Sequence, residues 1–257
     1  MPSMIRVTFS DRNLNISLPR GWHELSLQEL KMVYRFLTVY EPDVAPLAIF
    51  CRLANAKIIR EVDDKMLMSF RITPKVSVQS LVSPSQMMSY LSHLDWLGDP
   101  GNIPVRLPKI GGNYAVDAEL HGVPFSDYLR IESLYQAYLQ TQEPIIITRL
   151  ANVLYRGKNT IKKIDDVDTI CIFNWCAQIK AHFADTFKLF FKSAGGDEAP
   201  DMVDIMNAQL RALTGGDVAK EEQILAIDCW RALTELDAKA READELNKRL
   251  KKLKKTK

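Results

Sequence analysis

Apolar and polar residues alternate in two short runs at the start of the chain, residues 5–9 and 14–18. Alternation of this kind is typical of a strand with one buried face. Residues 11–13, Asp-Arg-Asn, supply a turn between the runs. The pattern predicts that the chain opens with a β-hairpin.

Two helix starts carry the same signals. Ser26 and Glu29 have the spacing of a capping box, in which each side chain bonds the backbone N–H of the other residue. Ser83 and Gln86 repeat this spacing, with Pro84 at the first helical position. The signals predict a helix over residues 27–38 and another over 84–97.

The sequence between these two helices is less regular. A further helix is expected after Asp43, ending near Asn55. Residues 66–82 are rich in β-branched and large apolar side chains, but Pro74 interrupts them. Because proline cannot donate to a ladder, short strands at a sheet edge are predicted.

Glycine and proline gather in residues 101–124, and the sequence after them reads as helical. Ser126 and Asp201 are expected to begin helices, and the pairs Gly195-Gly196 and Gly215-Gly216 are expected to end them. Helices are predicted over residues 126–138, 144–155, 166–192 and 201–213.

A last helix is predicted from Val218 to beyond Leu253, because apolar residues recur at threes and fours over most of this stretch. We expect the early members of the stripe, Trp230, Leu233 and Leu236, to lie in the core. Few residues follow the later members, so these are predicted to be partly exposed and to form a protein interface. They are Leu246, Leu250 and Leu253. The alternative is that the whole apolar stripe packs against other parts of the same chain.

These elements predict a mainly α fold with a small N-terminal β-hairpin and short-strand element. The N-terminal part is expected to be α+β and the C-terminal part helical. The expected organisation is an α+β part over residues 1–100, a Pro/Gly-rich connection over 101–124, a helical part over 125–216 and a long amphipathic helix with a basic end over 217–257. With 47% apolar residues the chain can build a packed core.

Charge is distributed unevenly along the chain. Residues 1–246 hold 27 basic and 32 acidic groups, whereas the last eleven residues carry seven basic groups and no acidic one. This candidate basic patch could meet phosphates or an acidic protein surface, or it could be a solvated helix end. Its members are Lys248, Arg249, Lys251, Lys252, Lys254, Lys255 and Lys257.

No motif indicates catalysis or a cofactor. Residues 157–159, Gly-Lys-Asn, lack both the hydroxyl residue and the earlier glycine of a phosphate loop. The four histidines are far apart in sequence, and Asp165, Asp166 and Asp168 are better explained as acids in the first turn of a helix. No serine or cysteine stands in a recognised nucleophile context. We therefore expect no catalytic, cofactor-binding or metal-binding residues, and a protein that is not an enzyme.

The four cysteines are scattered, and no segment is long and apolar enough to span a bilayer. Reduced, structural thiols and a cytoplasmic protein are expected. Cys171 and Cys176 are five residues apart, so they do not share a helix face, and each is expected to pack in the core.

Four stretches resemble uncharacterised proteins encoded in phage and prophage tail-gene clusters. They are residues 21–25 (Gly-Trp-His-Glu-Leu), 93–97 (His-Leu-Asp-Trp-Leu), 122–125 (Gly-Val-Pro-Phe) with Tyr128, and 211–242. The resemblance implies a tail assembly chaperone for the tape-measure protein or a small structural tail component. The chain lacks the frameshift arrangement of many tail chaperones and is large for one, so both roles stay open.

Together these observations favour a non-enzymatic tail assembly protein that binds the tape-measure protein or another tail protein through helical surfaces. It would act in the cytoplasm of the bacterial host, and incorporation into a virion stays open. The alternative is a nucleic-acid-binding accessory protein that uses the basic C-terminal end. Because residues 1–246 are net acidic, charge distribution favours the first hypothesis. Neither hypothesis defines an oligomeric state.

Overall fold

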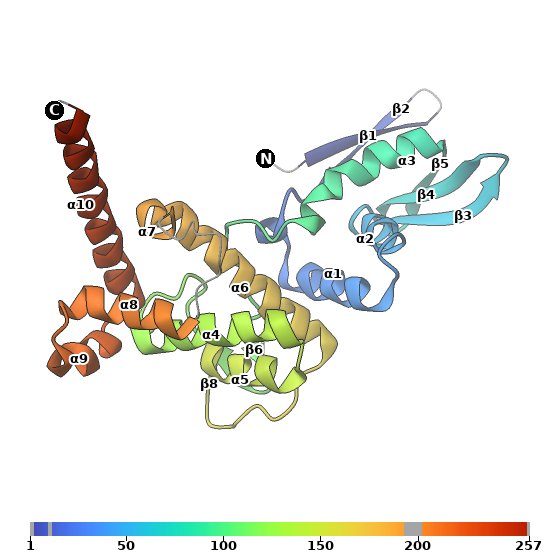
Figure 1. The fold of residues 1–257 in the computed structure, drawn as a ribbon. Helices are drawn as coiled ribbons and strands as arrows, with labels where there is room; N and C mark the ends of the chain where they lie inside the picture. The colour runs from blue at the N-terminus through green and yellow to red at the C-terminus, as the bar shows by residue number, and fades with distance from the viewer. Residues whose placement is uncertain (1–2, 10–11, 193–201, 256–257) are drawn as a thin grey trace. The chain divides into compact units, whose positions relative to one another are not determined.

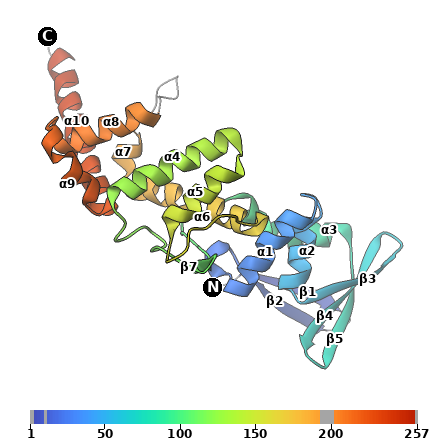
Figure 2. The same ribbon diagram turned by 90° about the horizontal axis from the view of Figure 1, so that it is seen from below.

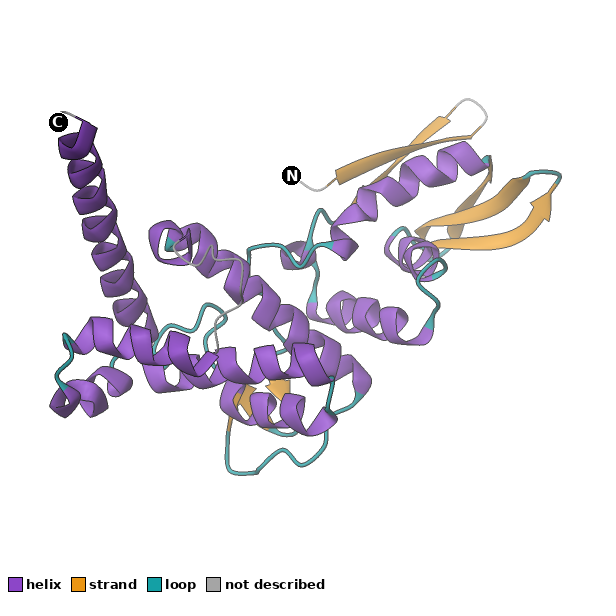
Figure 3. Ribbon diagram, viewed as in Figure 1, coloured by secondary structure: helices purple, strands orange, loops and turns teal. Residues whose placement is uncertain are grey.

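The computed structural model describes residues 3–9, 12–192 and 202–255. Helices predominate, as Figure 3 shows, so the chain is mainly α. It divides into two compact units, which are described separately. Unit 1 comprises residues 1–105 and 165–171, and unit 2 comprises residues 106–164 and 172–257. No helix in the described ranges has both the length and the apolar character needed to cross a bilayer.

Unit 1 combines a hairpin, a three-stranded sheet and short helices (Figure 1). In chain order its elements are β1 (Ser3–Phe9), β2 (Arg12–Leu18), η1 (Trp22–Glu24), α1 (Leu27–Val39), α2 (Ala45–Leu53), β3 (Ala56–Val62), β4 (Lys65–Thr73), β5 (Val76–Val82), α3 (Pro84–Leu91) and η2 (Ser92–Gly98). Strands β1 and β2 pair antiparallel with Ile5 opposite Ile16, which confirms the predicted hairpin.

Both predicted capping boxes are present. The Ser26 side chain accepts from the Glu29 backbone, and the Glu29 carboxylate accepts from the Ser26 N–H at 2.8 Å. Ser83 and Gln86 make the same pair of bonds at the start of α3. Each box satisfies N–H groups that have no partner inside the helix. The local signals thus set both helix starts.

Trp22 lies against α1 in the core of unit 1. Its ring stacks on Tyr34 at 5.1 Å and meets Trp96 edge-on at the same distance. Its indole N–H donates to the backbone oxygen of Asp99, and that of Trp96 donates to Pro19. These bonds join the segment before α1 to the end of η2.

Replacing Ser26 with alanine is expected to lower the free energy of unfolding by about 1 kcal/mol, because the N–H of Glu29 loses its acceptor. Ser26→Asp restores an acceptor and should recover most of the loss. Chemical denaturation measures both effects. An alanine variant as stable as the parent would contradict the cap.

The predicted edge strands are wrong in one respect. Residues 65–82 form two full strands, with β4 in the centre of the order β3-β4-β5, and Pro74 lies in the turn between β4 and β5. In the turn, proline removes no hydrogen bond from the ladder. Strand β3 was not predicted, because its half-exposed side chains lack a regular alternation. The helix expected over 84–97 also changes to a 3₁₀ helix at Ser92.

Unit 2 is built from helices around a small sheet. Its elements are β6 (Lys109–Ile110), β7 (Asn113–Ala115), α4 (Phe125–Thr141), α5 (Pro144–Leu154), β8 (Tyr155–Arg156), α6 (Asp166–Thr186), α7 (Lys188–Lys192), α8 (Met202–Thr214), η3 (Val218–Lys220), α9 (Glu221–Ala226) and α10 (Cys229–Lys255). The first residues of α6, through Cys171, group with unit 1.

Strands are not confined to the N-terminal part, contrary to the prediction. Strands β6, β7 and β8 form an antiparallel sheet, in which Tyr114 pairs with Arg156. These strands are only two or three residues long, too short for an alternation to be visible. Their pairing also joins segments about forty residues apart, which no local pattern specifies.

Trp175 is the largest fully buried side chain of the described core. Its indole N–H donates to the backbone oxygen of Ala118 at 2.8 Å. Its ring meets the edge of Tyr155, and the guanidinium of Arg106 lies 6.0 Å from the ring centroid. The residue therefore connects α6 to the loop before α4 and to β8.

Two predicted helix bounds in unit 2 need correction. Helix α4 starts at Phe125 after Pro124, not at a cap provided by Ser126, because Phe125 is buried and its N–H donates to Ile227. Helix α6 ends at Thr186, and α7 follows as a separate helix. Gly195, Gly196 and Asp201 lie outside the described residues.

The last predicted helix is divided as well. Gly215 and Gly216 end α8 with positive φ angles of 66° and 86°, as expected of glycines at a helix end. Asp217 then caps only a 3₁₀ turn, and the chain is extended at Ile227 before α10 begins. Asp228 forms an isolated bridge with Pro124, so a tertiary contact replaces the predicted continuous helix.

None of the four cysteines, all of which lie in the described residues, forms a disulfide; Cys51 is half-buried and the other three are buried. This confirms the structural packing expected for Cys171 and Cys176. Burial and the neighbouring Asp228 raise the pKa of Cys229 to about 12, and its thiol donates to the backbone oxygen of Leu120. A thiol held protonated in this way is a poor nucleophile.

Candidate functional site

The first turn of α10 is held by the loop that precedes α4. The carboxylate of Asp228 accepts from the N–H of Gly122 at 2.6 Å, and the N–H of Cys229 donates to Val123 at 2.9 Å. Asp228 also accepts from the N–H of Trp230 and so caps the helix. Hydrogen bonds on both sides therefore fix the position at which α10 starts.

Trp230 fills an aromatic cluster next to this start. Its ring meets Phe183 and Phe187 edge-on at 5.5 and 5.4 Å, and His121 stacks on it at 4.4 Å. Its indole N–H donates to the backbone oxygen of Glu119 at 2.7 Å. The cluster holds the N-terminal part of α10 against α6 and the loop before α4.

Asp237 makes the next anchoring contact. Its carboxylate is buried and accepts from the backbone N–H groups of Leu189 and Phe190 at 2.9 and 3.0 Å, within the first turn of α7. Arg241 lies 3.3 Å from the other carboxylate oxygen. Asp237 thus satisfies amides at a helix start with a negative charge, which the positive end of the helix favours. The same bonds explain why α7 is separate from α6.

Beyond these anchors the described side chains of α10 are no longer buried. Every side chain from Arg241 to Leu253 is exposed, and we call residues 241–253 the exposed segment. Figures 1 and 2 both show the end of α10 extending beyond α8 and α9 of the same unit. A solvated segment of this length is a marginal helix by itself. It continues from a part of α10 that is firmly packed.

The leucines of the apolar stripe divide as the sequence predicts, although Trp230, which was also expected in the core, is half-buried. Leu233 and Leu236 are 0% and 4% exposed, whereas the three later leucines are 59%, 47% and 66% exposed. Those three are Leu246, Leu250 and Leu253. At about 100° per residue their directions fall within about 60° of one another, so they line one face of the exposed segment. Contiguous exposed apolar side chains of this kind mark interaction surfaces.

Basic residues surround this face. Lys248, Arg249, Lys251 and Lys252 are exposed on α10. Lys254 and Lys255 belong to its last turn, and Lys257 lies outside the described residues. Lys248 bonds Asp244 at 2.7 Å one turn earlier, and this bond lowers the pKa of Asp244 and raises the pKa of Lys248. The helix therefore presents leucines on one face and cations on the others.

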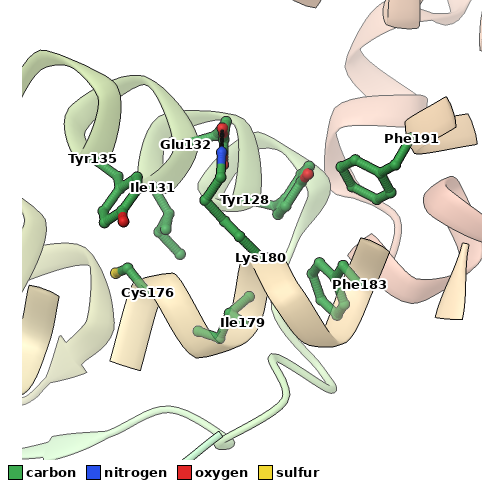
Figure 4. Close-up of a pocket in the computed structure, with 9 residues that line it drawn as sticks. All are labelled: Tyr128, Ile131, Glu132, Tyr135, Cys176, Ile179, Lys180, Phe183 and Phe191. Carbon is green, nitrogen blue, oxygen red and sulfur yellow. Dashed lines mark hydrogen bonds and ion pairs between the residues drawn. The ribbon is translucent and has the colours of Figure 1, made fainter. Parts of the chain in front are cut away.

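A small pocket lies between α4 and α6 (Figure 4). It encloses only about 10 Å³, which is room for about one water molecule. The Lys180 ammonium at its wall pairs with Glu132 and lies 5.5 Å from the ring centroid of Tyr135. Burial raises the pKa of Tyr135 to about 12 and that of Tyr128 well above its ordinary value. Both phenols stay protonated, and the arrangement reads as core packing.

Two histidines that are far apart in sequence meet at Trp230. His121 and His182 both approach the Glu119 carboxylate at 3.8 Å, and His121 also bonds Asp117 at 3.1 Å. No local signal brings these residues together, and sequence reasoning missed them. Within the described ranges no group of three or more His, Cys, Asp or Glu side chains is placed to hold a metal ion.

An acidic side chain caps the start of α6. The Asp165 carboxylate accepts from the N–H of Asp168 at 2.7 Å, which is the bond of an N-cap residue. Burial and the nearby Asp165 raise the pKa of Asp168. Gly157, in the Gly-Lys-Asn segment, packs closely on Asn113.

Comparisons of the chain with protein-family models, curated proteins and solved structures found no match.

Proposed function

We propose that this chain is a non-enzymatic assembly protein that binds a partner protein along the leucine face of its exposed segment. The observation that carries the proposal is the exposure of Leu246, Leu250 and Leu253 on a helix whose base is firmly held. Leucines spaced by four and three residues form the seam by which one helix packs on another. A partner helix or groove would bury this seam.

The resemblance to proteins of phage and prophage tail-gene clusters supports a tail protein as the partner. The tape-measure protein is the first choice, because it is long and helical in such systems. Under this proposal the chain acts in the cytoplasm of the bacterial host, as a tail assembly chaperone or as a structural tail component. Only the second role would place it in the finished virion.

A second candidate function is nucleic-acid binding by the basic residues of α10. Among the described residues, Arg249 and Lys251 form no ion pair. Cations that are free to contact phosphates produce an affinity that falls steeply as salt rises. A gel-shift assay across salt concentrations tests this alternative separately from partner binding.

The proposed interface is tested by a variant with Leu246→Gln, Leu250→Gln and Leu253→Gln. Glutamine has a helix propensity close to that of leucine, so the variant removes the apolar face and keeps the helix. The variant and the parent are each co-expressed with a phage tape-measure protein, and co-purification is measured. We expect the leucine variant to bind at least about tenfold more weakly, since burial of one leucine contributes about 1.5–3 kcal/mol.

A matched control places the same new residue on the opposite face. Lys248→Gln, Lys251→Gln and Lys252→Gln remove three charges and keep the leucines. This control should retain the protein partner. If it loses partner binding while the leucine variant keeps it, the leucine face is not the interface. Loss of salt-dependent oligonucleotide binding in the control alone would favour the second candidate.

A further inference from the structure

A polar cleft of about 440 Å³ lies in unit 1, away from α10 in sequence and independent of the function proposed above. The end of α1, helix α2 and one end of the β3-β4-β5 sheet form its walls. Three cationic side chains line it: Arg52 of α2, Lys57 of β3 and Arg71 of β4. The volume is within the range of small-ligand sites.

The strand register brings two of these cations to the same face of the sheet. Lys57 pairs across the strands with Ser69, and Arg71 pairs with Ser77. Residues 69 and 71 are two apart on β4, so their side chains point to the same face. Both serines also line the cleft. Two cations and two hydroxyl groups are therefore grouped on neighbouring strands.

Helix α2 places the third cation beside them. The chain turns from α2 into β3 at Asn55, which has a positive φ of 49°, and the backbone oxygen of Asn55 accepts from the N–H of Arg71 at 3.0 Å. This bond ties the end of α2 to β4. Arg52 and Arg71 thus come from segments that the backbone itself holds together.

The charge of the cleft is uncompensated within the described residues. No carboxylate lines it, and neither Arg52, Lys57 nor Arg71 forms an ion pair with any described side chain. Residues 1–105 carry 11 basic and 10 acidic side chains, so the grouping does not follow from a general excess of positive charge. Like charges collected without a counter-charge attract an anion.

Aromatic side chains close one wall. Phe36 of α1 and Tyr40, which follows the helix, lie edge to face at 5.2 Å, and Tyr40 is exposed. A planar group bound in the cleft would have a ring to pack against, while its anionic part met the cations.

We propose that this cleft binds a ligand through a phosphate group, with Arg52, Lys57 and Arg71 as its cationic partners and Ser69 and Ser77 as hydroxyl donors. The planar fork of arginine matches phosphate oxygens, and lysine adds a point charge. The phosphate can come from a free nucleotide or from a nucleic-acid strand.

Calorimetric titration of the full chain with inorganic phosphate, ATP and a twelve-residue single-stranded oligothymidylate tests the proposal and separates these sources. Saturable binding of ATP that the oligonucleotide does not exceed indicates a free nucleotide. Tighter binding of the oligonucleotide, weakening steeply with salt, indicates a strand. The control with Lys248, Lys251 and Lys252 replaced by glutamine is titrated in parallel, so that binding by α10 is recognised.

Arg52→Gln and Arg71→Gln should each weaken binding about tenfold, since a hydrogen bond to a charged group contributes about that factor. Arg60→Gln and Lys65→Gln remove the same charge from exposed positions of β3 and β4 that do not line the cleft, and they should change affinity less than about twofold. Equal weakening in all four variants would show a general charge effect and overturn the proposal.

The cysteine in the cleft gives a local readout in the unsubstituted protein. Cys51 is half-buried and lines the cleft, whereas the other three cysteines are buried, so an alkylating reagent should reach Cys51 first. Saturating ATP or oligonucleotide should slow alkylation of Cys51 at least about fivefold, because access of a thiol governs its reaction. No saturable binding by any of the three probes, or binding that leaves Cys51 unprotected, would overturn the proposal.

Discussion

Trp175→Ala is expected to lower the free energy of unfolding by about 3–5 kcal/mol, the largest stability effect of any single change proposed for this chain. Trp175 is fully buried, and its removal leaves a cavity beside Tyr155. The variant also leaves the backbone oxygen of Ala118 without its indole donor. Urea denaturation followed by circular dichroism measures the loss.

Trp175→Phe separates the two contributions. Phenylalanine keeps an aromatic ring in the core and loses only the hydrogen bond and part of the volume, so less than half of the alanine effect is expected. Alanine and phenylalanine variants of equal stability would mean that the ring does not pack as the structure shows.

Under the proposed function, truncation after Glu245 is expected to abolish partner binding and to leave the free energy of unfolding within about 0.5 kcal/mol of the parent value. The deletion removes all three exposed leucines and all seven basic residues of the C-terminal end. It leaves the anchoring contacts of Trp230 and Asp237 intact. Thermal unfolding and co-purification with the proposed partner, a phage tape-measure protein, measure the two outcomes.

Truncation after Ala232 is the matched contrast. It removes the buried residues Leu233, Leu236 and Asp237, and a loss of several kcal/mol is expected from the leucines alone. If the chain that ends at Glu245 unfolds as readily as the shorter one, the exposed segment contributes to the core. If it stays folded and still binds the partner, the interface lies on another surface.

The sequence correctly predicted helix ends that depend only on residues close together in the chain. Ser26 with Glu29 and Ser83 with Gln86 specify helix starts, because a cap and its target are three residues apart. The glycines at 215 and 216 specify a helix end for the same reason, since only the local backbone must adopt a positive φ.

Helix breaks that depend on contacts between residues far apart in the chain were not predicted from the sequence. Helices α6 and α7 are separate where Asp237, nearly fifty residues later, accepts from two backbone N–H groups. The break before α10 depends on pairing between Asp228 and Pro124. In both places the periodic pattern runs on unbroken, so it predicts a longer helix than the tertiary contacts allow.

The leucine face of α10 and the basic cleft of unit 1 differ in how far the sequence predicts them. The leucine stripe of the last helix could be predicted from the sequence alone, because it depends only on periodicity within one element. The cleft with Arg52, Lys57 and Arg71 could not be predicted. Its cations stand on a helix and two strands, and only strand register and the turn at Asn55 bring them together. The sequence by itself determined the starts of α1 and α3, the mainly helical class and the leucine face of the last helix. The tertiary structure alone decided the helix breaks, the second sheet and the basic cleft, because these depend on contacts between residues far apart in the chain.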